Sequence, residues 1–273
     1  MKKLFILILS LISLSVSGQL SDKTRIFLTT QGPDGIWVYH PLKGGAPKQI
    51  PETAGLGFRD LVIVNDVIYL TTQSPNGIWK YEIGSGKLPI QISSTAGYGF
   101  RSVIAVGNRL YLTTQAADGV FTYDIGSNQP PKQIPSTAGM GFRDLVQDML
   151  DVNLTTQGSD GIFKMEIDTD DIQRPTQKPG TAGLGFRSIA RNYYLTTQGS
   201  DGIFYYNAAE QKATQLANTA GLGFRGFVQI QDEILFTTQG PDGIWKYRID
   251  LGERPRQIPN TAGLGFRSMV LYY

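Results

Sequence analysis

One seven-residue phrase occurs six times along the chain. It reads TAGLGFR at residues 53–59, only its fourth residue varies, and the other copies stand at 95–101, 137–143, 181–187, 219–225 and 261–267. A second phrase, TTQ, recurs at spacings of 42, 42, 42, 41 and 41 residues, and it begins at Thr29, Thr71, Thr113, Thr155, Thr196 and Thr237. Self-similarity at a fixed period predicts that one supersecondary unit is repeated and stacked. A unit of about 42 residues therefore constrains the fold more than any other feature.

Each unit has the pattern of four short strands. In the unit that starts at Phe100, residues 100–106 alternate and predict a strand, Gly107 and Asn108 predict a turn, and 109–115 predict a second strand. A third strand is typified by residues 77–83 and a short fourth by 90–92. Aromatic and β-branched residues fill these runs, Gly, Pro, Asn and Asp separate them, and no stretch has a helical period. The unit is therefore all-β.

Four short strands in about 42 residues resemble one blade of the β-propeller repeat proteins, and the resemblance covers residues 24–273. It implies an all-β, six-bladed β-propeller. The predicted ends agree with a closed ring, because residues 24–31 form a second strand without a first and 265–273 a first strand without a second. We expect the C-terminal strand to complete the N-terminal blade, which removes the exposed sheet edges of an open array.

The two phrases are predicted to lie on one face of the ring. In a four-stranded meander the connections alternate between the two faces; TAGLGFR connects one blade to the next, and TTQ leads into the hairpin between the second and third strands. The connections predicted on the opposite face differ from unit to unit, and all the length changes fall there. We therefore expect one uniform face and one variable face.

The first 18 residues have the pattern of a secretory signal peptide, with Lys2 and Lys3 before a short apolar run that ends at Gly18. The remaining chain, 19–273, is predicted to be a single domain that is secreted or periplasmic, with no membrane span. Of the 25 basic residues two lie in the leader, which leaves 23 against 23 acidic residues. A formal charge of zero argues against nucleic acid as a partner. The absence of Cys excludes disulfides and thiolate metal sites.

Most of the repeated residues have a structural interpretation. The Asp-Gly or Asn-Gly pair after each TTQ is typical of a hairpin turn in which Gly takes a positive φ, and Asn76 in one copy argues against a metal carboxylate. The GxG of TAGLGFR has strands on both sides, unlike a dinucleotide fingerprint. Phe58 and its equivalents are expected to be wedges between blades. The fourth residue of the phrase, always apolar, either flanks a groove or packs down onto it.

The repeated Arg and Gln residues admit two interpretations. Arg can pair with the hairpin Asp and with backbone carbonyls, since an unpaired buried charge is costly. Alternatively, Arg and Gln point into the groove between blades and bind a polar ligand such as a glycan. The candidate ligand-binding residues are Gln31, Gln73, Gln115, Gln157, Gln198, Gln239, Arg59, Arg101, Arg143, Arg187, Arg225, Arg267 and the strand aromatics Trp37, Trp79 and Trp245. These aromatics either pack between blades or stack on a sugar ring.

The unit is also similar to those of six-bladed sugar-binding lectins. Together with the leader and the six-fold recurrence of Gln, Arg and aromatic residues on one face, this resemblance favours an exported, multivalent protein that binds carbohydrate at repeated inter-blade sites. The alternatives are a structural or protein-interaction scaffold and, more remotely, a hydrolase or lactonase of the propeller kind. We predict no enzyme activity, no cofactor and no metal site, because His40 is the only His and no Glu recurs at a fixed position.

Overall fold

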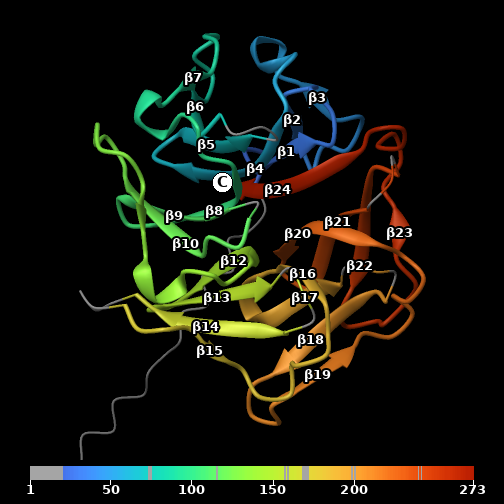
Figure 1. The fold of residues 1–273 in the computed structure, drawn as a ribbon. Coiled ribbons are helices and arrows are strands. Elements are labelled where there is room, and N and C mark those ends of the chain that lie inside the picture. The colour runs from blue at the N-terminus through green and yellow to red at the C-terminus, as the bar shows by residue number, and fades with distance from the viewer. Residues whose placement is uncertain are drawn as a thin grey trace, which may run out of the picture.

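The chain forms a ring of β-sheets around a central axis in a computed structural model (Figure 1). The residues that the structure describes are 21–72, 76–114, 116–156, 158, 160–167, 172–197, 199, 201–238, 240 and 242–273. The leader predicted at 1–18 lies outside them. Six four-stranded antiparallel sheets follow one another around the ring, which confirms the six-bladed propeller.

The blades have the predicted order of strands, with the first strand innermost in each. Blade 2 contains β4 (Phe58–Val64), β5 (Val67–Thr72), β6 (Ile78–Glu82) and β7 (Ile90–Gln91). Blade 3 contains β8 (Phe100–Val106), β9 (Arg109–Thr114), β10 (Val120–Asp124) and β11 (Lys132–Gln133). Blade 4 contains β12 (Phe142–Asp148), β13 (Asp151–Thr156), β14 (Ile162–Glu166) and β15 (Thr176–Gln177).

Blade 5 contains β16 (Phe186–Ile189), β17 (Tyr194–Thr197), β18 (Ile203–Asn207) and β19 (Lys212–Gln215). Blade 6 contains β20 (Phe224–Ile230), β21 (Glu233–Thr238), β22 (Ile244–Arg248) and β23 (Arg256–Gln257). Short 3₁₀ turns, η1 (Pro51–Thr53), η2 (Ser93–Thr95), η3 (Pro135–Thr137) and η4 (Arg191–Tyr193), are the helical elements of the described residues. None of these residues forms a helix with the length and hydropathy of a membrane span.

Blade 1 closes the ring with strands from both ends of the chain. Its order is β24 (Phe266–Tyr272), β1 (Arg25–Thr30), β2 (Ile36–Tyr39) and β3 (Lys48–Gln49). The last strand pairs antiparallel with the first, from Arg25 opposite Tyr272 to Thr30 opposite Phe266. The predicted closure is therefore confirmed, and the inner edge of blade 1 is supplied by the C-terminal strand.

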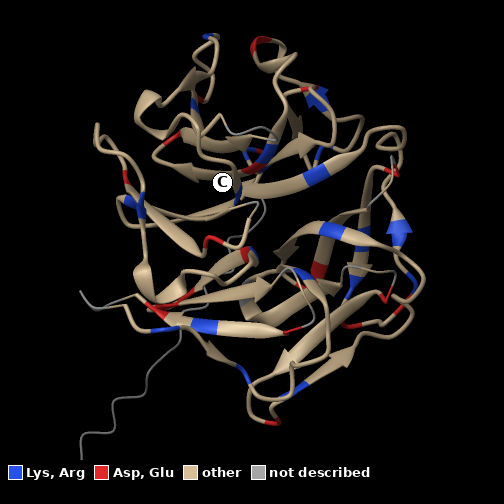
Figure 2. Cartoon of the chain, in the orientation of Figure 1, with Lys and Arg blue, Asp and Glu red and all other residues tan. Residues whose placement is uncertain are grey.

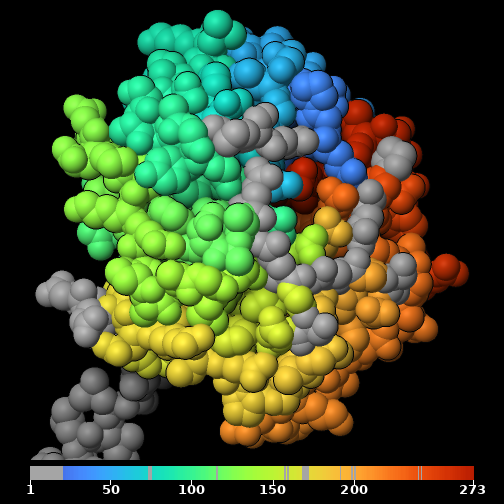
Figure 3. All heavy atoms as spheres, viewed as in Figure 1, coloured from blue at the N-terminus to red at the C-terminus, as the bar shows by residue number. Residues whose placement is uncertain are grey.

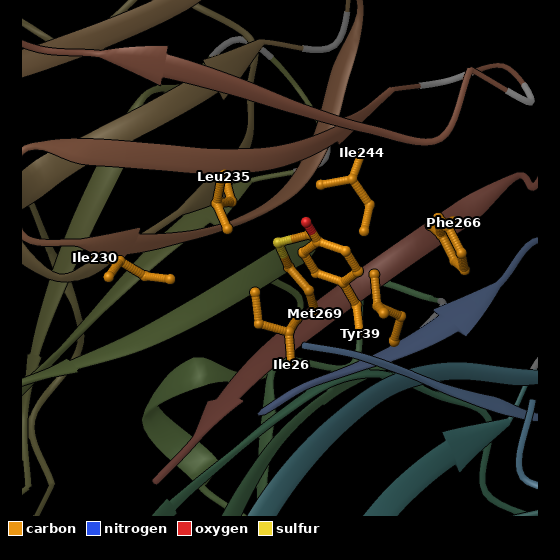
Figure 4. Packing of buried hydrophobic residues seen from close by; sticks show 8 residues of the cluster. Ile26, Tyr39, Ile230, Leu235, Ile244, Phe266 and Met269 are labelled. Atoms are coloured by element: carbon orange, nitrogen blue, oxygen red, sulfur yellow. The ribbon is translucent and has the colours of Figure 1, made fainter. Parts of the chain in front are cut away.

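Hydrophobic side chains from neighbouring blades meet between the sheets. In one such cluster, Leu235 and Ile244 of blade 6 pack against Ile26, Tyr39 and Phe266 of blade 1 (Figure 4). The predicted wedge residues are at most 1% exposed in every blade, namely Phe58, Phe100, Phe142, Phe186, Phe224 and Phe266. Each blade thus contributes to two hydrophobic clusters, one with each neighbour, and neighbouring blades depend on each other for burial.

The TTQ phrase and the hairpin that follows it both contact the TAGLGFR phrase, and the N–H of Gln31 donates to Gly265 O at 2.7 Å. The N–H of Gly35 donates to Leu56 O at 3.0 Å, and the N–H of Ile36 donates to Thr53 Oγ1 at 2.7 Å. Equivalent Thr side chains accept from the third strand in every blade at 2.7–3.0 Å. Gly35 has a φ of +71° and a Cβ there would lie 2.3 Å from Thr53 O, so this position admits only glycine. The prediction that both phrases share one face is confirmed.

Candidate functional site

Every repeated Arg is the extra residue of a β-bulge at the start of an innermost strand. In blade 2, Phe58 pairs with Thr72 and Asp60 with Thr71, which leaves Arg59 without a partner in the ladder. The same break in register surrounds Arg267, Arg101, Arg143, Arg187 and Arg225. A bulge redirects the side chain of its extra residue relative to a regular strand.

The six bulges bring the six Arg residues to one place on the axis of the ring. Arg59, Arg101, Arg143, Arg187, Arg225 and Arg267 all line a single cavity of about 130 Å³. The other residues of its lining directly follow these arginines, namely Asp60, Ser102, Asp144, Ser188, Gly226 and Ser268. Figure 3 shows the hollow at the centre of the ring, bordered by atoms from the N-terminal, middle and C-terminal parts of the chain.

The placement of the arginines differs from both interpretations offered by the sequence. They lie at the centre of the ring rather than in the groove between blades, because the bulge turns them toward the axis. Among the described residues, no ion pair joins any of them to the hairpin Asp residues. The repeated Arg is therefore not a tie between hairpins, and whether it binds a ligand stays a prediction.

Several guanidinium N–H groups are buried without a hydrogen-bond acceptor in the part of the chain that the structure describes. They are Nε and Nη1 of Arg59, Nε of Arg101 and Nε of Arg225. A buried donor without an acceptor costs about 1–3 kcal/mol, and more when it is charged. Six arginines against two aspartates give the cavity lining a formal charge of +4. The cavity therefore has an excess of positive charge and N–H donors that could bind an anion.

Burial, and in most cases repulsion by neighbouring arginines, lowers the pKa values of the six arginines. Burial and the neighbouring guanidinium groups lower the pKa of Arg187 and Arg267 to about 9 and that of Arg101 to about 10. Burial also lowers the pKa of Arg59 and Arg143, and the adjacent Asp60 and Asp144 oppose that shift. All six groups remain protonated at neutral pH, so the cavity stays strongly positive.

The repeated Thr of TTQ holds the backbone of the next bulge. Thr29 Oγ1 donates to Arg59 O at 3.2 Å, and Thr71 Oγ1 donates to Arg101 O at 3.4 Å. The same contact recurs from Thr113, Thr155 and Thr196 to the Arg carbonyl of the following blade. The second strand of one blade thus fixes the arginine of its neighbour, and this role of Thr is not evident from the sequence pattern.

Gln31 and the three predicted Trp residues do not line the arginine cavity. Gln31 lines a different hollow of about 410 Å³, an inter-blade groove that also includes Leu56 and Trp79. Its five counterparts lie outside the described residues, namely Gln73, Gln115, Gln157, Gln198 and Gln239. The structure therefore separates Gln31 and Trp79 from the arginines, which the sequence interpretation placed in the same groove.

The strand aromatics pack on the wedge residues. Trp79 makes an edge contact with Phe58 at a centroid distance of 6.4 Å, and Trp37 makes one with Phe266 at 6.2 Å. The indole N–H of Trp245 donates to Asp242 O at 3.2 Å, whereas the indole N–H groups of Trp37 and Trp79 are buried with no acceptor among the described residues. These two ring contacts lie within one blade, but Trp37 and Trp79 also pack against the hydrophobic clusters between blades, as one interpretation of the sequence predicted. A sugar-binding role stays a prediction.

A second series of Gln residues, on the fourth strands, is missed by the sequence interpretation. Gln49 Nε2 donates to Asp34 O at 2.6 Å, and Gln91 Nε2 donates to Asn76 O at 2.7 Å. The remaining blades repeat the bond through Gln133, Gln177, Gln215 and Gln257. These side chains anchor the hairpins, and their regular place before each TAGLGFR phrase is the signal that identifies them.

Other charges lie around the outside of the ring with both signs intermixed (Figure 2). Their ion pairs are exposed, as for Arg109 with Asp124 and Arg248 with Asp250, and such pairs contribute little to stability. In the described part of the chain, no group of three or more His, Cys, Asp or Glu side chains is arranged to hold a metal ion. The central cavity is thus the main concentration of charge.

No protein-family model and no curated protein matches the sequence. Solved propeller structures share its fold at low identity. A chain of a nidogen/laminin complex has a TM-score of 0.69 at 12% identity, covering 92% of this chain and 98% of that one. A putative 6-phosphogluconolactonase from Bacteroides fragilis has a TM-score of 0.59 at 9% identity, with coverages of 93% and 99%. Virginiamycin B lyase from Staphylococcus aureus has 0.57 at 14%, with coverages of 90% and 78%. These neighbours have varied roles and establish the fold alone.

Proposed function

We propose that this protein is an exported binding protein that holds one small, multiply charged anion in its central arginine cavity. The observation that carries the proposal is the convergence of six guanidinium groups, some with buried N–H groups that lack an acceptor among the described residues. Arg is the side chain best suited to oxyanions, because its planar fork donates to two oxygens at once.

The size of the cavity limits the part of the ligand that enters it. About 130 Å³ is close to the roughly 150 Å³ of an engineered cavity that binds benzene. A phosphate, a sulfate or a short dicarboxylate fits that volume, whereas a long polyanion does not. An excess of four positive charges in the lining favours a ligand with at least two negative charges.

Export rests on the leader predicted at residues 1–18, which supports a secreted or periplasmic protein. The absence of an enzyme activity also stays a prediction. The cavity lining offers arginines, serines and two hydrogen-bonded aspartates, and a binding role requires nothing further from it.

Calorimetric titration of the mature chain with sulfate, phosphate and succinate tests the proposal, with glycerol as the uncharged control. We expect one ligand per chain, affinity that falls as ionic strength rises, and an affinity loss of at least about ten-fold in Arg225→Gln. Arg109→Gln is the matched control, because Arg109 is an exposed residue paired with Asp124. If the folded protein binds none of these three anions, the proposal is refuted.

Lectin-like binding between blades is the second candidate, and it has an observation of its own. The groove that contains Gln31, Leu56 and Trp79 combines an apolar wall with the buried indole N–H of Trp79, which has no acceptor among the described residues. An aromatic face beside polar groups suits a sugar ring. A glycan array probed with the mature chain tests this candidate. We expect binding at up to six sites per chain, and we expect Trp79→Phe to weaken it. If the chain binds no neutral or acidic sugar, the interaction scaffold is left as the alternative.

A further inference from the structure

The residue after each Arg forms a second ring, and this ring is not six-fold symmetric. Around the axis from blade 1 it reads Ser268, Asp60, Ser102, Asp144, Ser188 and Gly226. Asp and Ser alternate through the first five positions, and Gly stands where a third Asp would complete the alternation.

Hydrogen bonds run continuously through the five side chains. Ser268 donates to Asp60, and Ser102 Oγ lies 2.6 Å from both Asp60 Oδ2 and Asp144 Oδ1. Ser188 donates to Asp144 Oδ2 at 2.5 Å. Each carboxylate also accepts a backbone N–H from the following blade, Val103 at 2.9 Å and Ile189 at 3.0 Å. The two aspartates therefore join five inner strands, β24, β4, β8, β12 and β16.

The chain of bonds stops on both sides of Gly226. Counting around the ring, blades 5, 6 and 1 carry Ser188, Gly226 and Ser268 and no acid, whereas blades 2 and 4 each carry one. The three guanidinium groups of this arc, from Arg187, Arg225 and Arg267, therefore have no Asp next to them on their own strands. Burial and then repulsion by other arginines lower the pKa of Arg187 and Arg267 to about 9, and no carboxylate opposes that shift.

The positive charge of the cavity is thus unequally distributed. Asp60 and Asp144 directly follow Arg59 and Arg143 on the two strands that flank Arg101, whereas Ser188, Gly226 and Ser268 follow Arg187, Arg225 and Arg267. At a spacing of several ångströms, a single missing charge changes the local energy of an anion strongly, because the surroundings are partly desolvated. An anion in this cavity is drawn away from the axis and toward Gly226.

We propose that the acid-free arc of Arg187, Arg225 and Arg267 is a subsite for one tetrahedral oxyanion, a phosphate or sulfate group. The bound anion would lie beside Gly226 and would supply the negative charge that an aspartate at that position would otherwise supply. This inference rests on the proposed function and adds the position and class of the ligand. Three guanidinium forks around one group match the several oxygens of a tetrahedral dianion better than the two oxygens of a carboxylate.

The test compares Gly226→Asp with Gly226→Asn, which have the same shape and differ by one charge. Both add a Cβ that would lie 3.0 Å from Arg267 O and from Ser268 Cα, so both carry the same packing cost. Calorimetric titration with inorganic phosphate, sulfate and glycerol 3-phosphate is the readout. We expect each dianion to bind the Asp variant at least about ten-fold more weakly than the Asn variant. Equal affinities would overturn the subsite.

A second pair of variants tests the position without a new Cβ. Arg225 belongs to the arc, and Arg101 lies opposite it between the two Asp-bearing blades. We expect Arg225→Gln to weaken phosphate binding several-fold more than Arg101→Gln, whereas equal losses would place the anion on the axis and refute the inference. Binding of glycerol 3-phosphate as tight as that of free phosphate indicates an ester ligand, and much weaker binding indicates the free ion. If the wild-type chain binds no anion, the proposed function fails; if it binds but the paired variants do not differ, only the subsite fails.

Discussion

The stability of this protein should fall as pH rises from about 4 to about 6, because the buried carboxyl group of Asp144 loses a proton over this range. Ser102 Oγ lies 2.6 Å from an oxygen of each carboxyl group. A hydroxyl group has one proton to donate, so both short contacts form only when one carboxyl is itself protonated. Burial, and then the charge of Asp60, raise the pKa of Asp144 from its ordinary 3.8 to about 6, against hydrogen bonds from Ser102, Ser188 and Ile189.

The sign and size of the effect follow from linkage. A carboxyl group whose pKa is higher in the folded state binds its proton more tightly there, so its protonation stabilises the fold. That stabilisation is complete below the unfolded pKa of 3.8 and is lost as pH rises through the folded pKa of about 6. A shift of about two units corresponds to a loss of up to about 3 kcal/mol in the free energy of unfolding.

Urea unfolding at a series of pH values between 3.5 and 7.5 measures this loss. Asp144→Asn keeps the shape and cannot titrate, so the wild type should lose up to about 3 kcal/mol relative to it across the window. Asp34→Asn, at an exposed hairpin position, is the control and should follow the wild type. Parallel curves for the wild type and Asp144→Asn would show that Asp144 holds no extra proton. The same proton adds positive charge to the cavity, so sulfate should bind more tightly below about pH 6.

Three further changes test the construction of the ring by urea unfolding. Gly35→Ala should lower the free energy of unfolding by about 3–5 kcal/mol, because Ala would combine a left-handed φ with a clash against Thr53 O. Gly55→Ala should lower it by only about 1–2 kcal/mol, since φ is similar there but a Cβ meets nothing within 4 Å. Equal losses would contradict the role of the contact with Thr53. Thr53→Val should cost about 1–3 kcal/mol by leaving the N–H of Ile36 buried without an acceptor, and an unchanged midpoint would contradict that role. Removal of residues 266–273 should abolish cooperative unfolding, because it takes the inner strand from blade 1; a cooperative transition at the original midpoint would contradict closure.

The architecture was predictable because each of its devices is local in the sequence. The 42-residue period, the buried wedge Phe58 and the hairpin Gly35 are each decided by residues within one unit. Ring closure was also predictable, since residues 24–31 and 265–273 lack complementary strands. Signals of this kind can be recognised in a single sequence, because they do not depend on which blades lie next to each other.

The position of the arginines was not predictable, because it depends on how two strands pair. Residues 58–64 read as a regular alternating strand, and only the register against 67–72 shows that Arg59 is an extra residue. The Asp and Ser ring was missed for a related reason. Its members differ from unit to unit, so Asp60, Ser102 and Gly226 look like variation after a constant phrase. They prove to be neighbours only once the inner strands converge on the axis.

Six copies of a phrase need not mean six binding sites. The turn glycine, the capping Thr and the wedge Phe act separately in each blade, because their partners lie within that blade or the next. Arg is different, since all six copies reach the same cavity and add to one field. A symmetric ring of six charges cannot orient a ligand, whereas one glycine in place of an acid gives the cavity a direction. We therefore expect one anion to bind per chain, with an affinity that depends on the absence of an acid at position 226 as well as on the arginines.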